Sequence, residues 1–215
     1  RRLVFQLFTL PRMAPTGAAG LGTLVEVLRR PGMGRGMLAC IFAFTGHFAF
    51  FTYLRPYLEG VAGVGVYGLS AILLGFGLAN FAGTSLAGLL VERSLWLAQL
   101  VSPLLMVLAA CGMVMAGRAP FADAGLVALW GIAFGIVPVA WSTWITRIVP
   151  DEAESGGGLL VATIQLAITI GAAGGGLVFD ASGARGVFSA SALVLLAASA
   201  MIFLGLRVRA ALAAS

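Results

Sequence analysis

Six long apolar segments constrain what this chain can fold into more than any other feature of its sequence. A helix of about twenty residues spans a hydrocarbon core about 30 Å thick, at 1.5 Å per residue. The chain is 60% hydrophobic and only 10% charged, whereas soluble domains carry about 25% charged residues. We therefore predict an all-α integral membrane protein with six transmembrane helices. The predicted helices are residues 37–58, 67–91, 94–116, 124–148, 156–179 and 186–206.

The positive charges predict how these helices are oriented. All thirteen basic residues are arginines, and cytoplasmic loops of membrane proteins carry an excess of basic residues. If the six helices alternate across the membrane, ten arginines fall on the side of the two chain ends and three on the other side. The three are Arg55, Arg118 and Arg185. Both ends of the chain are therefore expected in the cytoplasm.

The two ends of the chain carry no complete membrane helix. Residues 3–10 are too short to span a bilayer and have the pattern of the tail of an earlier helix, whereas residues 23–30 have the pattern of a short amphipathic helix. Because the sequence begins with arginine rather than methionine, we expect a longer chain. The expected division is 1–36 (end of a preceding helix plus a cytoplasmic central loop), 37–209 (six-helix bundle) and 210–215 (cytoplasmic tail).

The predicted helix 37–58 holds an unusual group of polar and aromatic residues. His47, the only histidine, falls near its middle, where a titratable group is costly and marks a functional site by default. The unperturbed pKa of histidine is near 6.5, so His47 is a candidate for substrate binding and for proton coupling; a buried, hydrogen-bonded histidine is the alternative. Phe48 and Phe51 are candidates for stacking on a planar substrate, or for packing. Arg55 either extends to the outer lipid headgroups or serves an outer gate.

Four residues on other predicted helices are further candidates for substrate contact. Asn80 and Gln165 lie near the membrane midplane, where transporters place their binding sites, and Thr169 follows Gln165 by one turn on the same face. Hydrogen bonds between helices explain these polar residues equally well. Trp141 lies toward the cytoplasmic side, where tryptophan also occurs as an interface anchor.

The acidic residues all lie away from the middle of the predicted helices. Glu92 and Arg93 fall in a two-residue cytoplasmic turn, where we expect an ion pair that helps to close an inner gate. As an exposed pair it is worth only about 0–1 kcal/mol. If protons drive the protein, coupling must therefore rest on His47 or on a part of the protein outside this sequence.

Three segments in order resemble one family of membrane transporters. Residues 47–56 (His-Phe-Ala-Phe-Phe-Thr-Tyr-Leu-Arg-Pro) resemble the seventh helix of the major facilitator superfamily, in its twelve-helix drug:proton antiporter type. Residues 88–93 (Gly-Leu-Leu-Val-Glu-Arg) resemble the second copy of its loop motif, with Val91 and Glu92 in place of alanine and aspartate. Residues 165–180 resemble its eleventh helix. Within the family, the nearest likeness is to purine-ribonucleoside and sugar efflux permeases.

The resemblance implies a fold, a function and partners. The fold would be one six-helix half-bundle of a twelve-helix carrier in the bacterial inner membrane, and its missing partner would be the N-terminal six-helix half. The function would be proton-coupled efflux of a nucleoside, sugar or drug-like solute by alternating access, without a cofactor or enzymatic activity. The loop motif implies a gating role for Gly88, Glu92 and Arg93.

Two other kinds of protein also have six membrane helices. A half-size membrane protein that dimerises or acts as a scaffold is one alternative. An intramembrane serine protease is a remote one, because Leu86 replaces the glycine expected after Ser85 and the only histidine precedes that serine. No metal-ligand spacing and no basic run with interleaved aromatic residues occurs, so we expect neither a metal nor nucleic acid as a partner.

Overall fold

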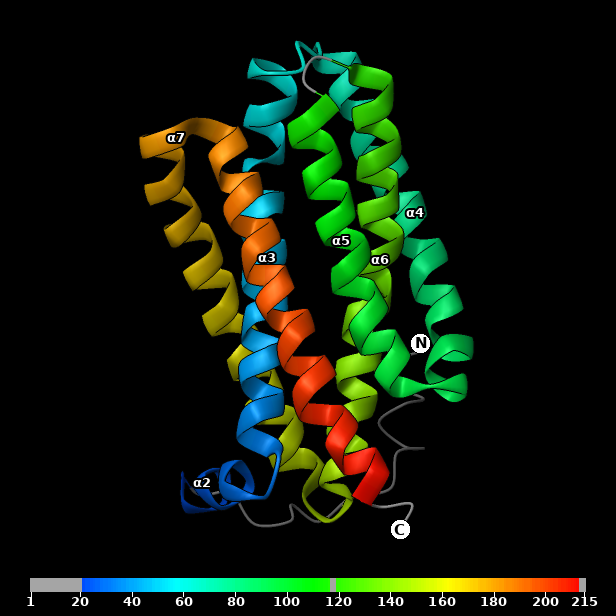
Figure 1. The fold of residues 1–215 in the computed structure, drawn as a ribbon, viewed down its shortest axis with the longest axis vertical. Coiled ribbons are helices and arrows are strands. Elements are labelled where there is room, and N and C mark those ends of the chain that lie inside the picture. The colour runs from blue at the N-terminus through cyan, green and yellow to red at the C-terminus, as the bar shows by residue number, and fades with distance from the viewer. Residues whose placement is uncertain (1–20, 117–118, 213–215) are drawn as a thin grey trace, which may run out of the picture.

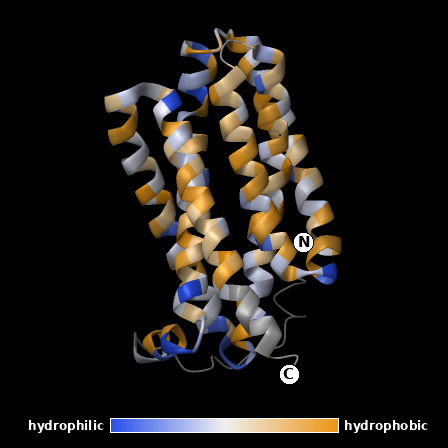
Figure 2. Ribbon diagram, in the orientation of Figure 1, coloured by the Kyte–Doolittle hydropathy of each residue, from blue (hydrophilic) through white to orange (hydrophobic). Residues whose placement is uncertain are grey.

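The computed structural model describes residues 21–116 and 119–212, which are almost entirely helical. The elements are α2 (Leu21–Arg29), α3 (Met33–Gly60), α4 (Val66–Arg93), α5 (Leu95–Ala116), α6 (Pro120–Ile148), the 3-10 helix η1 (Pro150–Glu152) and α7 (Ala153–Leu212). Among these described elements, α3 to α7 are long and apolar enough to cross a membrane, and Figure 2 shows apolar residues along each of them. The prediction of an all-α, multi-pass membrane protein is confirmed. The expected end of a preceding helix, residues 3–10, lies outside the described residues.

Helix α7 contains both of the last two predicted membrane helices. Within its 60 residues, Gly183 has non-helical backbone angles, φ 68° and ψ −173°, which only glycine adopts without strain. The chain reverses there, so residues 153–182 (the first arm) and 184–212 (the second arm) run in opposite directions (Figure 1). The loop expected near 180–185 is thus a single non-helical residue.

Helix α3 packs against both arms of α7. The Ser191 hydroxyl of the second arm donates a hydrogen bond to the Gly46 carbonyl oxygen at 2.6 Å. On the first arm, a Cβ atom at Gly171 would come within 2.6 Å of the carbonyl oxygen of Thr45. Glycine at Gly171 therefore lets the first arm approach the backbone of α3 closely, which is typical of packing between membrane helices.

Helices α4 and α6 also pack through glycines. A Cβ atom at Gly83 would overlap the carbonyl group of Ile132, and one at Gly131 would come within 2.7 Å of the carbonyl oxygen of Phe76. Other helices cover little of the rest of α4, since only 11% of its most apolar stretch is buried inside the protein. In contrast to Gly83, Gly88 faces open space, and a Cβ atom there would have no atom of another helix within 4 Å. Gly88 therefore makes no close helix contact.

The structure corrects the expected turn between the second and third membrane helices. Glu92 and Arg93 lie in the last turn of α4 and are exposed, and only Ser94 separates α4 from α5. The Ser94 hydroxyl oxygen accepts a hydrogen bond from the backbone N–H of Leu97 at 3.2 Å and so caps α5. In the described part of the chain no ion pair joins Glu92 to Arg93. Neighbouring residues on a helix point about 100° apart, and the predicted pair is therefore wrong.

Helix α6 begins earlier than expected, with Pro120 in its first turn, where proline is favoured. This start draws Asp123 into the first helical turn and buries it completely, with 0% exposure. Its Oδ1 lies 3.5 Å from the Tyr57 hydroxyl, which donates a shorter hydrogen bond of 2.5 Å to the Met113 carbonyl oxygen. These contacts tie the ends of α3, α5 and α6 together.

The amphipathic helix predicted for residues 23–30 is confirmed as α2. Its Val27 is buried against the bundle, and its end is attached by Arg30, whose two terminal guanidinium nitrogens each donate to a carboxylate oxygen of Asp151 at 2.6 Å. The Arg30 guanidinium holds the pKa of Asp151 below its usual value. Helix α2 is thereby attached to η1 at the same end of the bundle, as Figure 1 shows.

Candidate functional site

His47 lies in the middle of α3, enclosed by aromatic rings. Only 2% of it is exposed. The Trp130 indole N–H donates a hydrogen bond to His47 Nδ1 at 2.9 Å. The Phe134 ring lies parallel to the imidazole, with centroids 3.3 Å apart, and the Phe51 ring stacks at 5.6 Å. His47 is thus a buried histidine that is hydrogen-bonded to α6. This arrangement matches the alternative to proton coupling that the sequence left open.

Four phenylalanines form a partly exposed surface over His47, which we call the aromatic patch: Phe48, Phe51, Phe76 and Phe134. Phe51 is 37% exposed and the other three are half-buried. The Phe48 ring meets the imidazole edge-on at 4.9 Å, and the Phe51 and Phe76 rings are 5.1 Å apart. Because the patch draws on α3, α4 and α6, it offers a planar molecule apolar faces from three helices.

Asn80 borders the aromatic patch. It lies one turn after Phe76 on α4, so the two side chains share a face of that helix. Its amide nitrogen donates to the carbonyl oxygen of Gly131 at 3.3 Å, which joins α4 to α6 beside Trp130. Asn80 therefore makes a hydrogen bond between helices, while its place next to the patch keeps it a candidate for substrate contact.

Trp141 lies elsewhere in the bundle. It is 2% exposed, and its ring meets that of Trp144 edge-on at 5.4 Å. A Cβ atom at Gly36 of α3 would overlap the Trp144 ring, so the two tryptophans fill the space between α6 and the start of α3. Because Trp141 packs inside this half, we do not place it in the site.

Gln165 and Thr169 are both exposed on the first arm of α7. The Thr169 hydroxyl donates to the Gln165 carbonyl oxygen, one turn earlier in the same helix, at 3.0 Å. Ala167, between them, meets α3 through its carbonyl oxygen, 3.4 Å from the Thr45 hydroxyl. Residues two positions away lie about 200° around a helix, so Gln165 and Thr169 point away from α3. The structure does not bring them to His47.

The residues expected at the gates lie at the helix ends. Arg55 is exposed near the end of α3, and its Nε donates to the Glu59 carboxylate at 2.9 Å in the next turn. Glu92 and Arg93 are exposed at the opposite end of their own helix, after Gly88. Glu92 and Arg93 thus lie four turns or more after Phe76 of the aromatic patch on α4, whereas Arg55 follows Phe51 by only one turn of α3.

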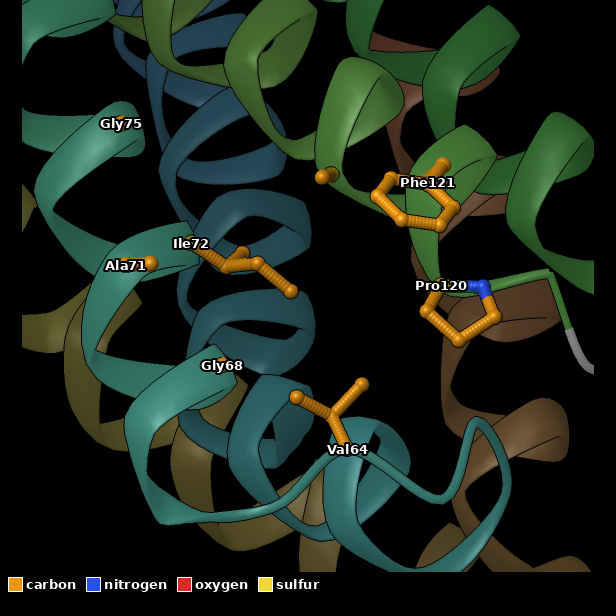
Figure 3. A pocket seen from close by; sticks show the side chains of 8 residues that line it. Val64, Gly68, Ala71, Ile72, Gly75, Pro120 and Phe121 are labelled. Atoms are coloured by element: carbon orange, nitrogen blue, oxygen red, sulfur yellow. The ribbon is translucent and has the colours of Figure 1, made fainter.

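A separate apolar pocket of about 380 Å³ lies between α4 and the start of α6. Figure 3 shows Ile72 and Val64 on one side of it and Pro120 and Phe121 on the other. All eight lining residues are apolar, so the pocket offers no side chain that would orient a polar solute. In this respect it differs from the aromatic patch.

The described residues do not support the serine-protease alternative. The Ser85 hydroxyl donates to the carbonyl oxygen of Phe81 in its own helix at 2.9 Å, while the Trp130 indole occupies the Nδ1 lone pair of His47. A serine nucleophile needs a base within hydrogen-bond reach. Over residues 21–116 and 119–212 no group of His, Cys, Asp or Glu side chains is placed to hold a metal ion.

Sequence reasoning missed three residues of the site: Phe76, Trp130 and Phe134. A signal for two of them exists, since Trp130 and Phe134 are aromatic and four positions apart, which places them on one face of α6. Nothing in the sequence, however, indicates that this face of α6 meets His47 of α3.

Comparison with known proteins finds that the chain is similar to proteins named as efflux pumps. It is 42% identical over 177 residues to the purine ribonucleoside efflux pump NepI of Escherichia coli (strain K12), which is 82% of this chain and 45% of the pump. It is also 42% identical over 178 residues to the pump of the same name in Salmonella paratyphi C (strain RKS4594), 83% of this chain and 45% of the pump. No protein-family model matches.

These relatives confirm the resemblance to purine-ribonucleoside efflux permeases that the sequence predicted. They are named as pumps and not as enzymes, as expected. The chain spans about half the length of the curated relatives that it matches.

Proposed function

We propose that this chain, related as it is to efflux pumps, forms the C-terminal half of a twelve-helix secondary transporter of the bacterial inner membrane. The transporter exports a planar organic solute by alternating access, and a purine ribonucleoside is the first candidate because the relatives are named for it. The observation that carries the proposal is the aromatic patch over His47, the one histidine, at the middle of a membrane helix. Both chain ends are cytoplasmic in this proposal.

The aromatic patch suits a planar heterocycle. Stacked aromatic pairs are worth about 0.5–1.5 kcal/mol beyond the burial of their area, and the partly exposed Phe51 and Phe76 rings offer faces for such contact. Transporters place their substrates near the midplane, between two bundles that rock against each other. The second bundle would therefore close over the patch and complete the cavity.

The driving force in this proposal is a proton gradient, and the carrier of the proton lies in the other half. His47 is the candidate within this chain, but its Nδ1 already accepts the Trp130 hydrogen bond and so is not free to take up a proton. The acidic residues of this chain lie at helix ends or in connections. At the rims, Arg55 serves the outer gate, and Gly88, Glu92 and Arg93 serve the inner one.

The test is efflux of a radiolabelled purine ribonucleoside by the full-length protein in proteoliposomes under an imposed proton gradient. Phe51→Ala removes one stacking surface and should raise KM by about 2- to 10-fold. Phe121→Ala, in the separate apolar pocket, is the matched control and should leave KM unchanged. Equal KM values for the two variants would refute the placement of the site, and no nucleoside transport at all would refute the substrate.

A half-size protein that dimerises remains the second candidate, since the chain has six membrane segments when α7 is counted as two arms. The mass of the natural protein in detergent separates the two proposals. A monomer of about twice this chain's 22.0 kDa supports the twelve-helix transporter, whereas two copies of a short chain support the dimer.

A further inference from the structure

The hydrogen bond between Trp130 and His47 decides which ring nitrogen of the histidine carries its proton. An indole N–H only donates, and here it donates to His47 Nδ1 at 2.9 Å. Nδ1 must therefore present a lone pair. In the neutral imidazole one nitrogen is a donor and the other an acceptor, so the proton of His47 is on Nε2.

Trp130 is held so that its N–H cannot turn away from the histidine. Its side chain is fully buried, and its ring lies nearly parallel to that of Phe50, with centroids 3.6 Å apart and planes 9° apart. Phe50 in turn stacks on Phe188 of the second arm of α7 at 4.2 Å. Rotation of the indole would break this column of stacked rings from three helices.

The other nitrogen of His47 has no hydrogen-bond partner among the described residues, although 98% of the residue is covered. Its surroundings are aromatic: Phe48 and Phe51 of α3, and Phe134 of α6. Charged residues on α3 lie two turns or more away, and two of them, Arg55 and Glu59, pair with each other. A donor in such a place requires an acceptor from outside this half.

We infer that Trp130 is a positioning residue that holds His47 as a neutral Nε2–H donor, and that the site therefore selects solutes with a hydrogen-bond acceptor in the plane of an aromatic ring. An aromatic ring nitrogen or a ring carbonyl fits this description. The ligand part of the inference rests on the proposed function, whereas the protonation of His47 does not. A solute without the acceptor leaves a buried N–H unpaired, which should weaken binding by about 5- to 100-fold.

The first experiment reads the ring nitrogens directly. In full-length protein labelled with ¹⁵N-histidine, the His47 signals are assigned by their loss in His47→Gln. We expect an unprotonated Nδ1 and a protonated Nε2 throughout the range in which free histidine titrates, about pH 5 to 8. Trp130→Phe keeps a ring to stack on Phe50 but removes the donor, and should give both tautomers and a titration within that range.

Trp141→Phe is the matched control, because it makes the same change at another buried tryptophan of α6 and should leave the His47 signals unchanged. A protonated Nδ1 in the wild-type spectrum overturns the inference whether or not a variant folds. Unchanged His47 signals in Trp130→Phe overturn it as well.

The second experiment measures binding of adenosine and of analogues in which each of the three ring nitrogens that carry an in-plane lone pair is in turn replaced by C–H. One analogue should bind about 5- to 100-fold more weakly than adenosine. The difference should shrink in Trp130→Phe, where the ring is free to move its proton to Nδ1, and persist in Trp141→Phe. Equal affinity for all analogues overturns the ligand part. Absence of any nucleoside binding refutes the proposed function, while the ¹⁵N spectrum still decides the state of His47.

Discussion

Removal of one buried hydroxyl, by Tyr57→Phe, tests how the adjoining ends of α3, α5 and α6 are held together. The Tyr57 side chain is fully buried, and its hydroxyl donates to the Met113 carbonyl oxygen at 2.5 Å. Met113 lies near the end of α5, so this hydrogen bond joins α3 to the end of α5. The hydroxyl also lies 3.5 Å from Oδ1 of Asp123, whose side chain is fully buried.

The variant removes this buried hydrogen bond and the hydroxyl beside the buried Asp123 carboxyl group, which costs about 1–3 kcal/mol. For a chain of 150–250 residues, 1 kcal/mol shifts the melting temperature by about 2–4 °C. We therefore expect Tyr57→Phe to lower the midpoint of thermal unfolding in detergent by about 2–12 °C. Cooperative loss of helicity, followed by circular dichroism, is the assay.

Tyr53→Phe is the matched control, one turn earlier on α3. Its hydroxyl is half-buried and donates a longer bond, 3.2 Å, to the carbonyl oxygen of Ala172, which lies inside the first arm of α7 and has a helical partner. The cost should stay below about 1 kcal/mol. If Tyr57→Phe melts no lower than Tyr53→Phe, the argument from the short, buried hydrogen bond of Tyr57 is refuted.

The remaining predictions concern stability and are measured by the same unfolding assay. Gly83→Ala should destabilise the protein by about 1–3 kcal/mol, because the added Cβ atom would overlap a backbone carbonyl group of α6. Gly88→Ala, whose Cβ atom would meet open space, should stabilise the protein by up to about 1 kcal/mol. Similar effects of the two substitutions on stability would contradict the close packing of α4 on α6. Gly183→Ala should cost about 1–3 kcal/mol, because the backbone at the reversal of α7 has φ 68°; an unchanged midpoint would contradict this. Since Arg30 holds the pKa of Asp151 below its unfolded value, about 3.9, the ion pair stabilises the fold at neutral pH and its contribution is lost as the pH falls through the lowered pKa. The difference in stability between wild type and Asp151→Asn should therefore begin to shrink as the pH falls below about 3.9 and vanish only below the lowered pKa of Asp151. A constant difference at all pH values would show that the pair contributes nothing.

Residue types indicate much of the site, but not its contacts. His47, Phe48 and Phe51 stand out in the sequence because a lone titratable group among aromatic residues is rare in a membrane helix. Trp130 does not stand out, because its role depends on the contact between α6 and α3. Its partner His47 lies more than eighty residues earlier in the sequence. The predicted depth of Gln165 in the membrane favours it as a candidate for substrate contact. However, Ala167 is the residue that meets α3, and Gln165, two positions earlier on the helix, points in another direction. Depth follows from position in an apolar run, whereas direction depends on which helices are neighbours.

The sequence by itself determined that this chain is a multi-pass helical membrane protein, because backbone groups in a bilayer must be satisfied within helices and the apolar runs have the required length. The sequence motifs also predicted the resemblance to efflux permeases, and the relatives confirm it. Only the tertiary structure decided that His47 bonds Trp130, that Asp123 is buried, and that Trp141 faces the interior. These features depend on where each helix ends, how it is rotated and which helices are its neighbours. Side-chain packing between distant segments decides all three, and the sequence pattern of a single segment does not indicate them.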